Sequence, residues 1–333
     1  LSYSDLLLSI ATAQWEEKDA REEITKFVDE INNIRNGFNF NKDFVLKSCL
    51  ILSDFADIAF KVDNFNKANM LAIEANWEKI SNAIRLAVEL VASYGYSRET
   101  LVSNNAIIPI AYYIFKKDLS DSFVSSDNSK EDRKAIKQWL VLSLTKRAFS
   151  GQPDNVLRPI RKIIKDNINS GYPTNEIIDH FKGTNKTLVF TSEDIDSLLA
   201  YQYGQSYTFS VLSLIYPSLD YRNVFHLDHI YPKSLFTRSK LLKAGVAEDQ
   251  VDEFTQRVNR IANLQLLEAI PNTEKSDRPF DVWLSETYSS DQEQDSYKEK
   301  HLISKSTPIG FLDFIEFFEA REGMIKEKLS SLL

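Results

Sequence analysis

Cysteine is almost absent from the sequence, because Cys49 is the one cysteine in 333 residues. A single cysteine excludes an intramolecular disulfide bond and fits a protein of a reducing compartment. The residues on both sides, Ser48 and Leu50 to Leu52, are mostly apolar. We therefore expect a buried thiol without a catalytic role.

Long apolar segments are also missing. No stretch approaches the roughly 18 to 20 apolar residues that a membrane-spanning helix needs. The amino end lacks the basic region and the small-residue cleavage site of a signal peptide. These two absences predict a cytoplasmic protein. The chain begins with leucine rather than methionine, and we expect a processed chain or a piece of a longer one.

A glycine-rich phosphate loop is the third absence, so no motif predicts nucleotide binding within this chain. The net charge of −8 disfavours a general nucleic-acid coat protein, although local charge decides what a cleft attracts. A hydrophobic fraction of 43% and a charged fraction of 26% are ordinary for a globular protein. The length favours two domains, which we expect at residues 1–220 and 221–333.

Hydrophobic spacing predicts a mainly α fold. Apolar residues recur at helical intervals from the amino end to about residue 117, with very little glycine or proline. Within this region, residues 73–91 are predicted to form one long helix. Further expected elements are helices at residues 107–115, 175–181 and 310–333, a helix capped by Ser192, a short strand at residues 186–191 and a loop at residues 285–300.

One segment of this acidic chain is strongly basic. From Lys130 to Lys165 there are ten basic and three acidic residues, a local excess of seven positive charges. Contacts to DNA phosphates need such charge, so we predict a phosphate-contacting surface that includes Arg158, Arg161 and Lys162. The alternative, a solvated helix face, stays open.

Residues 226–234, HLDHIYPKS, hold two of the four histidines. Adjacent side chains of a strand point to opposite faces, so Asp228 and His229 can serve one site only where the strand ends. Pro232 is consistent with such an end. We predict that Asp228 is an oxygen ligand of Mg²⁺ or a similar ion, and that neutral His229, with a reference pKa near 6.5, is the general base that acts on water.

Two asparagine motifs follow, NRIANLQLL at residues 259–267 and PNTEKS at residues 271–276. Asn272 can add an amide oxygen to a hard metal without adding charge, and a helical turn would place Lys275 near phosphate. Asn263 can use its amide to pin the connecting loop to the second strand.

Two further residues of HLDHIYPKS are candidates for DNA contact. His226 alternates with Asp228 along the predicted strand, so it can line the site and touch phosphate. A structural role for His226 is the alternative. Lys233 adds a positive charge near the end of the motif. His180 and His301 have no partner motif, and we expect both to be structural.

Together the three motifs resemble those of HNH (ββα-metal) nucleases, most closely the C-terminal nuclease domain of GmrSD-like type IV restriction proteins. The helical part is also similar, through SDLLLSIATAQW and IEANWEKI. The resemblance implies a helical scaffold followed by a ββα-metal domain with a short β-hairpin. It implies Asp228 and Asn272 as metal ligands, His229 as base and Asn263 as hairpin support. It further implies Mg²⁺ or Mn²⁺ as cofactor and DNA as substrate.

The sequence departs from this family in two ways. It has no DGQQR-like motif of the family's amino-terminal ParB-like domain, which we expect as a partner within a longer protein. The gap between Ile230 and Asn259 is longer than in a minimal HNH hairpin, which predicts an inserted helix at residues 248–260.

The function expected from these motifs is a metal-dependent DNA endonuclease that restricts foreign or modified DNA. Two alternatives remain open. His226 and His229 could ligate a structural zinc ion, which would need further nitrogen or sulfur ligands. The chain could also be a non-catalytic nucleic-acid-binding or regulatory module that keeps a degenerate HNH fold.

Overall fold

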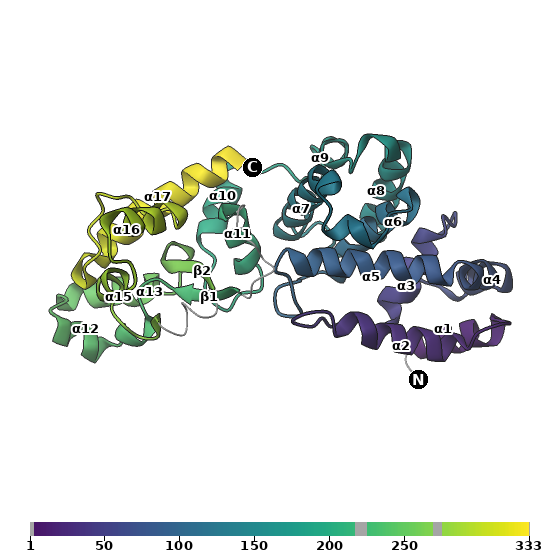
Figure 1. Cartoon of the computed structure of the whole chain (residues 1–333), viewed down its shortest axis with the longest axis horizontal. Coiled ribbons are helices and arrows are strands. Elements are labelled where there is room, and N and C mark those ends of the chain that lie inside the picture. The colour runs from purple at the N-terminus through teal and green to yellow at the C-terminus, as the bar shows by residue number, and fades with distance from the viewer. Residues whose placement is uncertain (1–2, 217–224, 269–274, 333) are drawn as a thin grey trace. The chain divides into compact units, whose positions relative to one another are not determined.

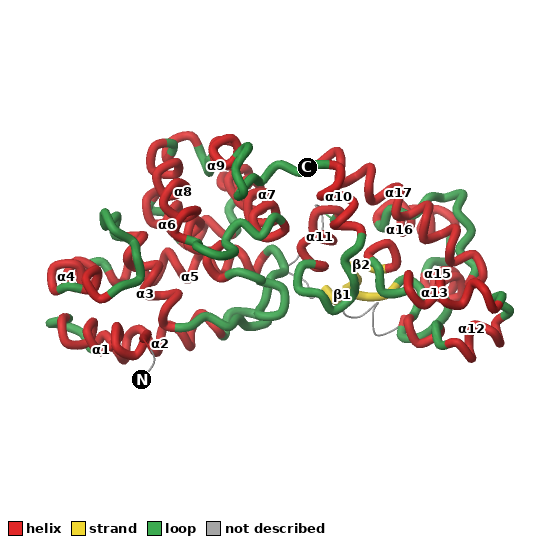
Figure 2. Tube along the Cα trace, turned by 180° about the vertical axis from the view of Figure 1, so that it is seen from behind, coloured by secondary structure: helices red, strands yellow, loops and turns green. Residues whose placement is uncertain are grey.

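The computed structural model describes residues 3–216, 225–268 and 275–332 (Figure 1). In these ranges it contains sixteen α-helices and one two-stranded antiparallel hairpin, which confirms the mainly α fold (Figure 2). The chain forms two compact units, residues 1–188 and 189–333. The domain boundary expected between residues 220 and 221 remains a prediction. No described helix is long and apolar enough to span a membrane.

The first unit is a helical assembly whose centre is the apolar helix α6. All residues from Ile107 to Ile114 in this helix are buried, and α6 packs against α3, α5 and α8. Pro109 lies in its first turn, where the missing N–H costs no helical hydrogen bond. The helices of this unit are α1 (Tyr3–Gln14), α2 (Ala20–Asn32), α3 (Lys42–Leu52), α4 (Lys67–Ala75), α5 (Trp77–Ser93), α6 (Ile107–Lys117), α7 (Lys130–Thr145), α8 (Asp154–Asp166) and α9 (Thr174–Phe181).

The long helix predicted at residues 73–91 is wrong, because the chain breaks at Asn76 between α4 and α5. The Asn76 side chain donates to the carbonyl of Ala72 at 2.9 Å and ends α4. The break lets Trp77 start α5 and pack edge-on against Trp15, with ring centroids 5.6 Å apart. The indole N–H of Trp77 also donates to Glu23 at 2.8 Å. Tertiary contacts therefore override an unbroken hydrophobic pattern.

The second unit surrounds the hairpin with helices and an aromatic core. The ring of Tyr231 lies 4.8 Å from that of Phe317, 5.3 Å from that of Phe314 and 5.5 Å from that of Phe280. This cluster joins the segment after β1 to α15 and α17. The elements are α10 (Ser192–Leu199), α11 (Thr208–Ile215), β1 (Phe225–His229), α12 (Arg238–Ala244), α13 (Val251–Arg257), β2 (Leu264–Glu268), α15 (Phe280–Thr287), α16 (Asp291–Lys300) and α17 (Phe314–Leu332).

Local predictions in this half of the chain were less accurate. Residues 186–191 form no strand; they lead into α10, whose N-cap is Thr191 rather than the predicted Ser192. The loop predicted at residues 285–300 is wrong, because most of it belongs to α15 and α16. Ser290 and Glu293 form a reciprocal capping box at the start of α16. The polar composition of this segment belongs to a solvated helix, in which Tyr297 is the buried residue.

The helix predicted at residues 248–260 is present in shorter form as α13, which runs from Val251 to Arg257. A further helix, α12, also lies between the two strands. The final helix α17 begins at Phe314, four residues later than the predicted start at residue 310. The insertion in the hairpin connection is thus helical, and its helices pack on the aromatic core that supports the strands.

Candidate functional site

The hairpin brings the first two sequence motifs side by side. β1 pairs antiparallel with β2 so that Asp228 lies opposite Gln265 and His229 opposite Leu264. His229 is the last residue of β1, and the next amide, that of Ile230, donates to the carbonyl of Asn263 at 2.8 Å. Asp228 and His229 therefore lie at a strand end, where the backbone can turn both toward one site.

The Asp228 carboxylate is held by two buried side chains. Its Oδ2 accepts a hydrogen bond from Gln265 Nε2 at 2.9 Å and an ion pair from Lys275 Nζ at 2.9 Å. The Asp228 side chain is 14% exposed, whereas that of Lys275 is completely buried. Tyr297 donates its hydroxyl to Gln265 Oε1 at 2.5 Å. Since both ends of the Gln265 amide are engaged, the chain Tyr297–Gln265–Asp228 fixes the direction of the carboxylate.

Lys275 connects the helical side of the site to the end of β1. Besides its ion pair with Asp228, its ammonium group donates to the backbone carbonyl of His229. Burial lowers the pKa of Lys275, and the negative charge of Asp228 opposes that shift. The lysine predicted to contact phosphate therefore lies inside the protein, where it balances the charge of the predicted metal ligand.

The imidazole of His229 is oriented by two residues. Its Nε2 lies 3.0 Å from Asn259 Oδ1, and its ring lies 4.6 Å from that of Tyr203 at an interplanar angle of 33°. An amide oxygen only accepts, so Nε2 carries the proton and Nδ1 keeps its lone pair. Burial lowers the pKa of His229, while the hydrogen bond to Asn259 and the charge of Asp228 oppose the shift. The lowered pKa favours a neutral imidazole near neutral pH.

Asn263 is completely buried and ties the two hairpin segments together. Its Oδ1 accepts from the amide of Tyr231 at 2.9 Å, and its Nδ2 donates to the carbonyls of Tyr231 and Val258 at 3.1 and 2.8 Å. Arg321 of α17 supports the same turn by donating to the carbonyl of Ala262 at 2.7 Å. The asparagine thus contacts backbone on both sides of the hairpin connection.

Of the other residues predicted for the site, two are exposed and one lies outside the described residues; the other two histidines of the chain lie elsewhere. His226 and Lys233 are exposed, so both side chains can reach a ligand from solvent. Asn272 lies outside the described residues. His301 is buried and pairs with the hydroxyl of Tyr216 through Nδ1 at 3.0 Å, and His180 packs edge-on against its neighbour Phe181.

The three basic residues predicted to contact DNA from the helical scaffold lie on α8 in the first unit and have partners within that unit. Arg158 pairs with Asp57 at 2.7 Å. Arg161 donates to the carbonyl of Phe55 at 2.8 Å, and Lys162 pairs with Asp166 at 2.5 Å. Acidic and carbonyl oxygens therefore offset part of the positive charge that the sequence places here.

Four residues of the site were not predicted: Gln265, Tyr297, Asn259 and Tyr203. Gln265 carries a signal in the sequence, because a glutamine between leucines in a short strand is a polar residue at a buried position and needs a partner. Asn259 belongs to a motif that drew attention only to Asn263. Tyr297 and Tyr203 lie far from the motifs along the chain, and no local pattern indicates their contacts.

The Asp228 carboxylate is a ligand of the type that a hard divalent cation takes. Mg²⁺ commonly binds through one or two carboxylates and keeps several of its waters, and the partly exposed Asp228 carboxylate offers such an oxygen. Over residues 3–216, 225–268 and 275–332, no group of three or more His, Cys, Asp or Glu side chains could hold a metal ion. The zinc alternative, which needs four such ligands, therefore finds no complete set in that part of the chain.

Comparison with known proteins finds one matching family model. The model of the GmrSD restriction endonucleases, C-terminal domain, matches residues 109–306, which is more than half of the chain. The matched region contains β1, β2 and the two residues at the end of β1. No curated protein matches the sequence.

Proposed function

The chain belongs to the GmrSD restriction endonuclease family through its C-terminal domain, and from this membership we propose that it hydrolyses DNA phosphodiester bonds with a divalent metal ion. The observation that carries the proposal is the position of Asp228 and His229 together at the end of β1, each held by its own hydrogen-bond partner. A hydrolase of this kind needs a metal ligand and a base near one phosphate.

Asp228 is the proposed metal ligand, with Asn272 as the second. Gln265 and Lys275 contact only Oδ2 of the Asp228 carboxylate, which leaves Oδ1 to face a cation. When bound, Mg²⁺ or Mn²⁺ supplies positive charge to the non-bridging and leaving oxygens of the phosphate. Asp228 and Asn272 would hold the ion, and Gln265 would fix the direction of the Asp228 carboxylate.

His229 is the proposed general base. Its Nδ1 takes a proton from a water molecule, whose oxygen then forms the new bond to phosphorus, while the bond from phosphorus to one ester oxygen breaks. The leaving oxygen receives its proton from solvent. Asn259 keeps the proton on Nε2, so that Nδ1 is the atom that points its lone pair at water. Asn263 does not contact the reacting atoms; it fixes the turn that carries His229.

The DNA is held by positive charge around this centre. His226 and Lys233 are exposed beside β1 and are the proposed phosphate contacts. Lys275 can reach phosphate only if its ammonium group leaves Asp228, so its contribution in the arrangement described above is to balance that carboxylate. We further propose that the cleaved DNA is foreign or modified DNA, in line with the family's restriction activity.

A plasmid assay tests the proposal. The purified chain is incubated with supercoiled plasmid and with modified phage DNA in Mg²⁺, in Mn²⁺ and in EDTA, and nicked and linear products are followed on gels. Metal-dependent cleavage that Asp228→Ala abolishes, and that higher metal concentration partly restores, supports the proposal. Retardation of DNA without cleavage under every condition would instead favour a binding module.

A further inference from the structure

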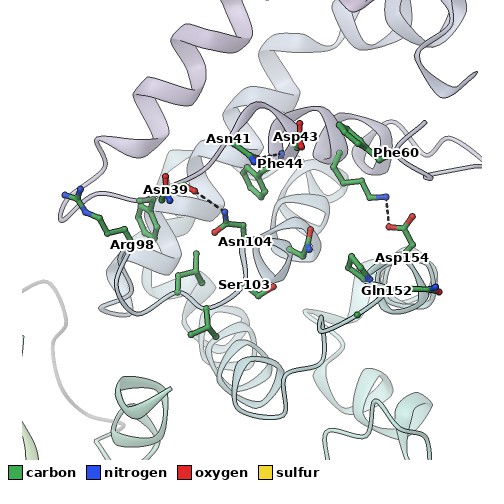
Figure 3. Close-up of a pocket in the computed structure, with 17 residues that line it drawn as sticks. Asn39, Asn41, Asp43, Phe44, Phe60, Arg98, Ser103, Asn104, Gln152 and Asp154 are labelled. Atoms are coloured by element: carbon green, nitrogen blue, oxygen red, sulfur yellow. Dashed lines mark hydrogen bonds and ion pairs between the residues drawn. The ribbon is translucent and has the colours of Figure 1, made fainter. Parts of the chain in front are cut away.

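A pocket in the first unit, remote in sequence from the hairpin, has a volume of about 820 Å³. It lies between the segment that leads from α2 into α3, the segment that precedes α6 and the start of α8 (Figure 3). This volume is within the range of about 300 to 1,000 Å³ that is usual for small-ligand sites. No step of the proposed hydrolysis uses it.

The lining combines flat apolar rings with amide groups. Three phenylalanines contribute aromatic surface, and the remaining polar lining is dominated by asparagine and glutamine. The aromatic residues are Phe38, Phe44 and Phe60, and the amide residues are Asn39, Asn41, Asn104, Asn105 and Gln152. Such a surface can stack a planar ring and at the same time bond to its edge.

Some of these amides already form hydrogen bonds within the protein. Asn41 caps α3 by accepting from the amide of Phe44 at 3.0 Å. Asn104 donates to the carbonyl of Asn39 at 3.2 Å. Gln152 accepts from Asn155 at 3.1 Å. These side chains shape the wall of the pocket rather than offering free donors.

Other polar groups of the lining are uncommitted. Within the part of the chain that the structure describes, the side chains of Asn39, Asn105 and Arg98 have no hydrogen-bond or ion-pair partner. Oδ1 of Asp43 is buried and also lacks a partner there. A buried carboxylate oxygen without a donor is costly. The pocket therefore offers amide groups and the side chain of Asp43, whereas the Arg98 guanidinium lies against Gly37 and points away from the pocket (Figure 3).

The charges of the lining exclude a polyphosphate. Asp154, at one end of the pocket (Figure 3), pairs with Lys47 at 2.5 Å. Arg98 and Asp43 then contribute one charge of each sign. A triphosphate would meet two carboxylates and at most one uncommitted cation, whereas an uncharged ring with donors and acceptors on one edge would meet matching groups.

We infer that this pocket binds a nucleobase, presented as an unstacked nucleotide of the DNA. The identification of the source as DNA rests on the proposed function. Bases stack on aromatic side chains, amides pair with base edges through two hydrogen bonds, and a carboxylate accepts from an exocyclic amino group. Asp43 consequently selects the amino-bearing bases adenine, cytosine and guanine over thymine.

Fluorescence of 2-aminopurine tests the inference without any cleavage. The full chain is titrated in EDTA into duplex and single-stranded oligonucleotides that carry one 2-aminopurine, whose fluorescence rises when the base leaves the stack, and binding is followed separately by anisotropy. We expect a rise with the wild-type chain. Asn105→Ala and Asn39→Ala should each weaken the complex that gives this rise by about 5- to 150-fold, the range for loss of a good base contact.

Asn36→Ala is the matched control, because Asn36 is an exposed asparagine of the same α2–α3 segment that does not line the pocket. It should leave the fluorescence rise unchanged. Asp43→Asn should retain binding while losing the preference for amino-bearing bases in oligonucleotides that differ only at the tested position. Circular dichroism of each variant verifies the fold.

Three outcomes would overturn the inference. Oligonucleotide binding without a fluorescence rise would show that no base leaves the stack. A rise that persists in both pocket variants would place the unstacked base elsewhere. Calorimetry could show that free mononucleotides bind the wild-type chain and not the pocket variants, while no base of DNA is unstacked. That result would rule out DNA as the source. Cleavage in Mg²⁺ is measured separately. If the chain unstacks a base but never cleaves the DNA, the proposed hydrolysis is refuted and the inference about the pocket is not.

Discussion

Replacing Gln265 by leucine removes the link between Tyr297 and Asp228 while keeping a side chain of similar size. The Gln265 amide donates to Asp228 at 2.9 Å and accepts from Tyr297 at 2.5 Å, and Gln265 is completely buried. Leucine can make neither bond. Asp228 would keep Lys275 as a partner, but the plane of its carboxylate would no longer be fixed.

Two magnitudes follow for Gln265→Leu. Loss of a residue that orients a metal ligand costs about 10- to 100-fold in metal affinity or activity, so we expect the Mg²⁺ dependence of cleavage to shift to higher concentration by that factor. The buried hydroxyl of Tyr297 also loses its acceptor, which lowers the free energy of unfolding by about 1–3 kcal/mol. Calorimetric titration with Mn²⁺ and urea denaturation measure the two effects separately.

Ser213→Ala is the control for Gln265→Leu. Ser213 is buried in the same unit and donates to the carbonyl of Ser210 at 2.8 Å, so its loss also removes one buried hydrogen bond. Ser213→Ala should lower the free energy of unfolding by about 0.5–1.5 kcal/mol, the value of one intramolecular hydrogen bond, while metal affinity stays unchanged. Metal affinity of Gln265→Leu within about threefold of wild type, well below the loss expected for such a partner, would refute the positioning role.

The other predictions concern the scaffold charge, one buried histidine and the thiol. Reversing Arg158, Arg161 and Lys162 to glutamate should weaken binding of all DNA sequences alike and reduce the slope of log affinity against log salt by up to about three; an unchanged slope would assign these residues to intramolecular pairing only. Burial lowers the pKa of His301 well below its usual value, so the unfolded state binds more protons than the folded state below about pH 6.5. As the pH decreases below that value, the free energy of unfolding should decrease by up to about 1.4 kcal/mol per pH unit. His301→Gln should flatten that fall in urea titrations at several pH values, and parallel profiles would contradict the reasoning. Burial raises the pKa of Cys49 to about 12, so a thiol reagent at pH 8 should label the chain only after denaturation, and fast labelling of the native chain would place the thiol at the surface.

The helical class of the fold could be predicted because helix periodicity is a local property of the sequence. The position of the hairpin could be predicted because its strand end coincides with a chemically distinctive motif. The errors arose where tertiary contacts or caps decide where a helix begins or ends. Asn76 ends one helix, and Trp77 starts the next by packing on Trp15. The capping box of Ser290 supports a helix in a segment whose composition resembles a loop.

The candidate site shows the same division between local and long-range information. Asp228 and His229 are adjacent in sequence, so their shared strand end could be predicted. Gln265 faces Asp228 only through the strand register, and a connection with two inserted helices hides that register from the sequence. Tyr297 reaches Gln265 from a helix whose existence was not predicted. Residues that position a group through tertiary contacts leave little local signal.

The most direct test of the central claim is the cleavage rate of His229→Ala in saturating Mg²⁺. His229 packs against Tyr203 and bonds to Asn259, and neither contact lies in the core of the second unit, so the variant should fold and bind DNA nearly as the wild type does. If His229 is the base, single-turnover cleavage should slow by about 10²- to 10⁴-fold. A rate within about threefold of wild type, with DNA affinity unchanged, would exclude His229 from general-base catalysis.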